Sequence, residues 1–76
     1  MNREKMAQKL KELRGDKPRE EVAVELGISY SSVVAYELGE RVPRDEVKVK
    51  IASYYGVPVE DIFFIGQNDT QSNQNN

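Results

Sequence analysis

The chain has 76 residues, contains neither cysteine nor histidine, and carries a formal net charge of −2 from 11 basic and 13 acidic side chains. A chain of this length forms one small domain, and its composition excludes disulfides, thiolate metal sites and catalysis by a histidine base. The charged N-terminus predicts no signal peptide, and no apolar run reaches the roughly 20 residues of a membrane span. We therefore expect a cytoplasmic protein that is not an enzyme and needs no metal, cofactor or small-molecule ligand.

The N-terminal segment predicts one amphipathic helix and the start of another. Within residues 3–14, the apolar residues Met6, Leu10 and Leu13 recur at helical spacing and form one stripe. After a short break, Pro18 suits the first turn of a second helix, where its missing N–H is not needed. The first helix should therefore bury one face against the rest of the domain.

A pair of short helices joined by a tight turn occupies about residues 19–38. The first of the pair ends at Gly27, a residue that readily adopts the left-handed conformation that stops a helix. Ser29 is a good N-cap for the second, which runs roughly over residues 30–38. A pair of this size is typical of a helix-turn-helix, whose second helix enters the major groove of DNA. The residues expected to face the core are Val22, Ala23, Leu26, Val33 and Tyr36.

Residues 44–55 fit two patterns. Residues 47–51 alternate between apolar and charged side chains like a strand, whereas Val47 and Ile51 also fit helical spacing. We choose a helix, because no second strand pattern supplies a sheet partner. A short final helix is expected at about 59–64.

The C-terminal residues 66–76, GQNDTQSNQNN, are almost devoid of apolar groups. Such a segment cannot bury enough surface to offset the entropy of ordering it, so we predict a disordered polar tail. The folded domain would then occupy residues 1–65.

Three segments in this order resemble the Cro/CI-type helix-turn-helix family, also called XRE-type transcriptional regulators. They are EEVAVELGIS (20–29), the pattern YE-x-G-x-R-x-P (36–43) and KIASYYGVPVEDIF (50–63). The resemblance covers about residues 3–64. It implies an all-α, compact five-helix bundle of the lambda-repressor-like DNA-binding type. It also implies binding to double-stranded operator DNA, commonly as a homodimer, and many members are repressors of phages or mobile elements.

The chain departs from the family pattern at several positions near the expected DNA surface. Arg19 stands where the family often has a glutamine that touches DNA, and Leu38 stands where asparagine is frequent. Pro18 and Pro58 replace serines that often cap the second and fifth helices. The connection after Arg14 also looks about two residues shorter than usual in the family. These differences bear on the DNA contacts rather than on the fold.

The resemblance assigns base reading to the outward, N-terminal face of the third helix. That face has no Arg, Lys, Asn or Gln to make bidentate contacts with a base edge, so we expect a preference based on thymine methyls, tyrosine contacts and DNA shape. Two alternatives stay open: Tyr30 could pack on its own helix, and Val34 could belong to the core. The residues assigned to base reading are Ser29, Tyr30, Ser31, Val34 and Ala35.

Phosphate contacts are expected on both sides of the third helix. Arg19 lies at the N-terminus of the second helix, where free backbone N–H groups also favour a phosphate. Arg41 and Arg44 flank Pro43 in the loop after the third helix, and Ser32 lies within that helix. The alternative for each arginine is an ordinary solvated surface cation.

The charge is uneven along the chain. Residues 1–19 hold seven cations against three carboxylates, a net charge of +4, whereas residues 19–44 hold three against five, a net charge of −2. Because phosphate neutralisation supplies most non-specific affinity, we expect modest and salt-sensitive DNA binding. The acidity also leaves open a protein-interaction module on the same fold, such as an antirepressor or an antitoxin-like partner.

Two further assignments concern contacts between helices and between copies of the chain. The resemblance implies a structural ion pair between Arg14 and Glu37, joining the first and third helices. The apolar run Phe63, Phe64 and Ile65 could either close the core or form a dimer patch. A two-fold dimer would place two reading helices about 34 Å apart on one face of the duplex.

Overall fold

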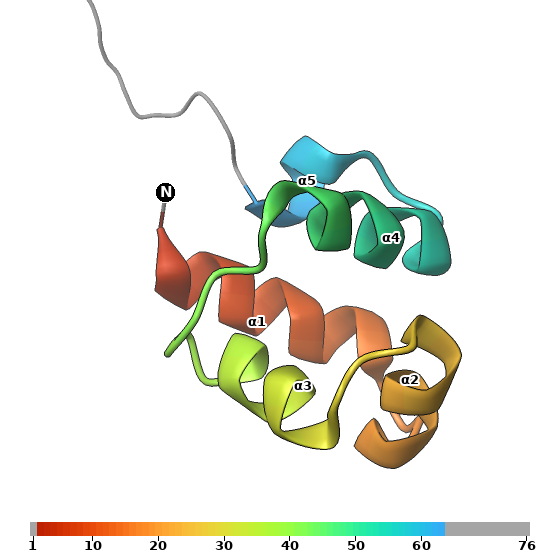
Figure 1. Cartoon of the computed structure of the whole chain (residues 1–76). Helices are drawn as coiled ribbons and strands as arrows, with labels where there is room; N and C mark the ends of the chain where they lie inside the picture. Colours follow the sequence, from red (N-terminus) through yellow and green to blue (C-terminus); the bar gives the residue numbers. More distant parts are fainter. Residues whose placement is uncertain (1, 64–76) are drawn as a thin grey trace, which may run out of the picture.

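The computed structural model describes residues 2–63, which form five α-helices and no β-strand (Figure 1). The predicted all-α five-helix fold is thus confirmed. The C-terminal segment 64–76, including the predicted tail, lies outside the described residues. Among residues 2–63, no helix is both long and apolar enough to cross a membrane. The helices are α1 (Arg3–Arg14), α2 (Arg19–Leu26), α3 (Tyr30–Glu37), α4 (Asp45–Tyr55) and α5 (Val59–Phe63).

The ends of the helices follow from local side-chain and backbone chemistry. Asn2 caps α1, because its side-chain oxygen accepts the Lys5 N–H at 3.0 Å. Ser29 caps α3 in the same way, as predicted. Gly27 ends α2 in the left-handed conformation, with φ of 71°. At Gly39, φ is 73° and a β-carbon would lie 3.2 Å from a backbone oxygen of α1, so only glycine suits this turn.

The core lies where α1 and α4 meet the other three helices. In Figure 1, α1 runs across the middle of the molecule, with α2 and α3 on one side and α4 and α5 on the other. All five predicted core residues of α2 and α3 are buried, together with Met6 from α1 and Ile62 from α5. The helix pair 19–38 therefore packs on one side against α1 and α4, which leaves its opposite side free.

Burial along α4 follows the helical pattern rather than the strand pattern. A strand would place residues 47, 49 and 51 on one face, yet Ile51 is buried while Val49 is exposed. Ala52, adjacent to Ile51, is buried as well, as expected for a helix that packs one side against α2 and α5.

Phe63 belongs to the core rather than to a dimer patch. Its exposed fraction is 0%, and the ammonium of Lys48 lies 5.7 Å from the centre of its ring. The dimer-patch assignment is therefore wrong for Phe63, because a helix as short as α5 is anchored by its last residues against α1 and α4. Phe64 and Ile65, the other two residues of the apolar run, lie outside the described residues.

The burial of Phe63 predicts a large effect of truncation on stability. Phe63→Ala should lower the free energy of unfolding by about 3–5 kcal/mol, because it removes the ring and leaves a cavity. The measurement is urea denaturation followed by circular dichroism. Val24→Ala, at an exposed position of α2, is the control and should change stability by no more than about 0.5 kcal/mol. Wild-type stability of Phe63→Ala would contradict the burial of this side chain.

Candidate nucleic-acid interface

The orientation of α3 depends on a buried carboxylate. Glu37, near the end of α3, is the one charged residue among residues 2–63 that is buried. Its Oε2 accepts the Nε–H of Arg14 from α1 at 2.8 Å, and its Oε1 accepts the Nε–H of Arg19 from α2 at 2.8 Å. The structure therefore brings the expected Arg14–Glu37 pair together and adds a second arginine to it. One carboxylate joins the first three helices.

The same cluster holds the connection between α1 and α2. The Nη1 of Arg14 donates to the backbone carbonyl of Lys17 at 2.9 Å, so one guanidinium contacts both the buried carboxylate and the turn. Two guanidinium groups on one carboxylate leave a net charge of +1. Because Glu37 is 3% exposed at its side chain and its charge is paired twice, the cost of burying it is offset by charge-assisted hydrogen bonds.

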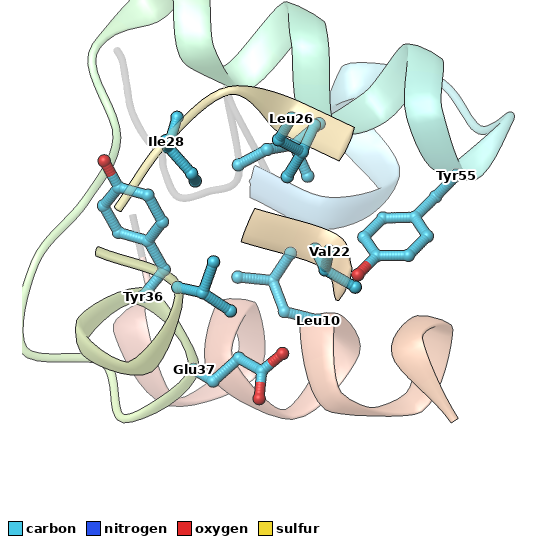
Figure 2. Close-up of a pocket in the computed structure, with 9 residues that line it drawn as sticks. Leu10, Val22, Leu26, Ile28, Tyr36, Glu37 and Tyr55 are labelled. Atoms are coloured by element: carbon cyan, nitrogen blue, oxygen red, sulfur yellow. The ribbon is translucent and has the colours of Figure 1, made fainter. Parts of the chain in front are cut away.

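A small cavity of about 20 Å³ lies beside this carboxylate in the core (Figure 2). Leu10, Val22 and Tyr55 are among the residues that line it, and Figure 2 shows Tyr55 reaching from α4 towards Val22. Burial raises the pKa of Tyr55 to about 12, and the negative charge of Glu37 acts in the same direction. The Tyr55 hydroxyl therefore stays neutral beside the carboxylate.

Arg19 does not stand as a free surface cation. Its side chain is 35% exposed, and its Nε–H is engaged by Glu37. The hydrogen bond to Glu37 raises the pKa of Arg19, and the hydroxyl of Tyr30 acts in the same direction. Sequence reasoning missed this contact, because nothing local shows that the start of α2 approaches the end of α3.

The expected reading face is mostly open. Tyr30 is half-exposed, Ser29 and Ser31 are exposed, and Val34 is partly buried. The Oγ of Ser29 accepts the Ser32 N–H at 3.1 Å and lies 3.2 Å from the Ser31 Oγ. The serine hydroxyls are thus already connected to one another at the start of α3.

Ala35 departs from the expectation for that face. It is buried, with 9% of its surface exposed, whereas the open face was expected to include it. The backbone N–H groups of Glu40 and Arg41 both donate to the Ala35 carbonyl, so the chain after α3 turns back past this residue. Its inclusion in the open face is therefore corrected.

Three of the four expected phosphate ligands meet at one surface hollow of about 460 Å³ between α3 and the start of α4. Ser32, Arg41 and Arg44 line it, and the Nη2 of Arg41 donates to the Ser32 Oγ at 3.2 Å. The Arg41 guanidinium also lies 5.5 Å from the centre of the Tyr36 ring, an attractive cation–π arrangement. Glu46 lines the same hollow and reduces its positive potential.

The acidity of residues 19–44 is smaller at the surface than the sequence suggests. Glu37 is buried and paired, and Glu25 accepts hydrogen bonds from Tyr54 and from the ammonium of Lys17 at 3.3 Å. The Tyr54 hydroxyl, followed by Lys17, lowers the pKa of Glu25. Lys17 in turn donates to the Tyr54 hydroxyl at 2.8 Å, so this cation joins the connection before α2 to α4.

Comparison with known proteins identifies the class. The family model described as helix-turn-helix matches residues 5–62, which span α1 to α5. The chain belongs to this family, the XRE-type helix-turn-helix proteins.

Two curated relatives are transcriptional regulators. The chain is 40% identical over 45 residues to an uncharacterized HTH-type transcriptional regulator of Methanocaldococcus jannaschii, a match that covers 59% of this chain and 68% of that protein. It is 36% identical over 56 residues to the cryptic phage CTXphi transcriptional repressor RstR of Vibrio cholerae, which covers 71% of this chain and 50% of the repressor. The chain thus spans half the length of the latter. No solved structure matches.

The double pairing of Glu37 predicts a strong dependence of stability on this carboxylate. Glu37→Gln should lower the free energy of unfolding by up to about 3–5 kcal/mol, because it leaves two guanidinium groups without a buried counter-charge. Glu21→Gln is the control, since Glu21 lies 3.9 Å from Lys17 in an exposed pair that contributes less than about 1 kcal/mol. Equal losses in the two variants, measured by urea denaturation, would show that the buried pairing contributes little.

The neutral state of Tyr55 predicts a loss of stability in alkali. Its pKa is raised from 10.0 to about 12, so the unfolded chain releases this proton first and stability falls as pH rises from 10 through 12. Tyr55→Phe should weaken this fall in urea denaturation series at increasing pH. Ser53→Ala, at an exposed position without a titrating side chain, should leave the fall unchanged. A fall that is equally steep in wild type and Tyr55→Phe would contradict the assignment.

Proposed function

We propose that this protein binds operator double-stranded DNA in the cytoplasm as a homodimer and represses transcription, with α3 in the major groove. The observation that carries the proposal is the placement of arginines along both edges of an open α3 face. Tyr30 and Glu37, two helical turns apart, mark the edge that Arg19 contacts. Ser32 and Tyr36, one turn apart, mark the edge that Arg41 contacts.

The chemistry between those edges suits a weak direct reading of bases. Tyr30 offers a ring and a hydroxyl, Ser31 a hydroxyl, and Val34 an apolar edge for a thymine methyl. None of these makes the bidentate contacts that dominate strong readers, so DNA shape would contribute a large part of the preference. Ser29 serves chiefly as the N-cap of α3, because its hydroxyl already accepts a backbone N–H.

Phosphate contacts would come from both edges. Arg41, Arg44 and Ser32 share one hollow beside α3, and Arg19 lies at the opposite edge next to Tyr30. The cluster of Arg14, Arg19 and Glu37 carries a net positive charge there. Such an arrangement supports binding to a polyanion although the net charge of the chain is −2.

Repression and dimer formation are the finer parts of the proposal. The likeness to a phage repressor of Vibrio cholerae, over half the length of that protein, motivates repression. A two-fold dimer would double the few phosphate contacts of one domain and place two α3 helices about 34 Å apart. Phe64 and Ile65 are the proposed dimer residues that remain once Phe63 is assigned to the core.

The proposal predicts that recognition depends on the start of α3. The double variant Tyr30→Ala, Ser31→Ala should reduce the preference for the DNA upstream of its own coding region over a shuffled duplex. The loss should be smaller than the roughly 1–3 kcal/mol, about 5- to 150-fold, that one bidentate base contact supplies. Fluorescence anisotropy at several salt concentrations measures both affinities, and footprinting gives the spacing of the half-sites.

The control for this experiment is Ser53→Ala, at an exposed position of α4. It should bind like the wild type, and circular dichroism should show all variants folded. An unchanged preference in the double variant would contradict the assignment of the reading face. A wild type without salt-sensitive DNA binding, but with a protein partner that buries α3, would favour the protein-interaction module instead.

A further inference from the structure

We propose that Glu37 is a positioning residue for DNA binding, which holds the Arg19 guanidinium so that its outer N–H groups meet a phosphate beside Tyr30. The inference rests on the proposed DNA-binding function and names how one contact of that site is built. It assigns to a core carboxylate a part in affinity as well as in stability.

The geometry of Arg19 indicates that one side of its guanidinium contacts Glu37 while the other side faces outward. Its Nε–H points inward to Glu37 at 2.8 Å, where the carboxylate is 3% exposed, while the arginine side chain as a whole is 35% exposed. A guanidinium carries five N–H donors in a rigid plane, so fixing the Nε–H also fixes the direction of the two terminal amino groups. Within residues 2–63, the only other group found to interact with this guanidinium is the Tyr30 hydroxyl, so the side turned away from Glu37 can meet a phosphate next to Tyr30.

Arg14 makes this arrangement effective. It binds the other oxygen of Glu37 at 2.8 Å and thereby supplies a second positive charge to the same carboxylate. Without Arg14, Glu37 would neutralise Arg19 and weaken its attraction for DNA. With both arginines present, the cluster keeps a net charge of +1, and Arg19 is its more exposed member.

Prior orientation reduces the entropy lost on binding. A free arginine loses the freedom of several rotatable bonds when it meets a phosphate, whereas Arg19 loses that freedom when the domain folds. Arg44 provides the contrast, because it is exposed and no carboxylate partner is found for it among residues 2–63. The two arginines should therefore respond differently to the same substitution.

Replacing an arginine with lysine tests whether its orientation, or only its positive charge, contributes to DNA binding. Lysine carries its three N–H donors on one nitrogen, so an ammonium that stays next to Glu37 does not present the separate, outward amino groups of a guanidinium. If Glu37 orients Arg19, Arg19→Lys should behave like Arg19→Gln although it keeps the positive charge. Arg44→Lys should behave like the wild type.

The experiment measures affinity for a labelled duplex of the upstream DNA over a series of KCl concentrations. We expect Arg19→Lys and Arg19→Gln each to reduce the magnitude of the negative slope of log K against log[salt] by about 0.9, the change for one phosphate contact. Arg44→Lys should leave the slope unchanged. All titrations are made below the melting temperature of the least stable variant, so that every protein is folded.

A double-mutant comparison tests the role of Glu37 itself. Glu37→Gln should make the negative slope less steep in the wild-type background, because the orientation of Arg19 is lost although the cluster gains positive charge. It should not do so in Arg19→Gln, because the contact is already absent there. A merely structural role would change stability and leave the slope unaltered in both backgrounds.

The outcomes separate the inference from the function on which it rests. A wild-type slope in Arg19→Lys would overturn the inference, since the charge alone would then suffice. A wild-type slope in Arg19→Gln would overturn it as well, since Arg19 would then contact no phosphate. A wild-type protein without salt-dependent binding would instead overturn the proposed function. The comparison of the Arg19 variants leaves Glu37 intact and stays decisive even if Glu37→Gln fails to fold.

Discussion

The pairing of one buried carboxylate with two arginines is the interaction on which the rest of this structure depends. Glu37 lies on α3, Arg14 on α1 and Arg19 on α2, and both hydrogen bonds measure 2.8 Å. A domain this small has few core contacts with which to set helix angles. Directional, charge-assisted hydrogen bonds supply that orientation, because an unpaired charge at this depth would be costly. The angle of α3, and hence the direction of its open face, follows from them.

The same helix carries both the framework and the proposed recognition surface. Glu37 at the end of α3 and Tyr30 at its start lie on one edge, two turns apart, and Arg19 approaches both. A change at this edge therefore affects stability and DNA contacts together. The opposite edge is less constrained, because Arg41 lies over the Tyr36 ring and donates to Ser32 without a buried carboxylate partner among residues 2–63.

Folding changes how the charged residues of segment 19–44 contribute to the potential at the surface. A sum over residues 19–44 treats every carboxylate as a surface charge and gives an acidic segment. In the structure, Glu37 is buried between two cations, and Glu25 is engaged by Tyr54 and Lys17. What matters for an approaching polyanion is the potential at the surface, and this is less negative than the sum implies.

The sequence by itself determined the five helices, the caps at Ser29 and Gly27 and the core residues of α2 and α3, because periodicity and capping act within a few residues along the chain. Family resemblance added the Arg14–Glu37 pair and the open face of α3. Only the tertiary structure decided that Arg19 shares Glu37, that Ala35 is covered and that Phe63 is buried. Each of these depends on how segments distant in sequence pack together, and local patterns carry no information about that packing.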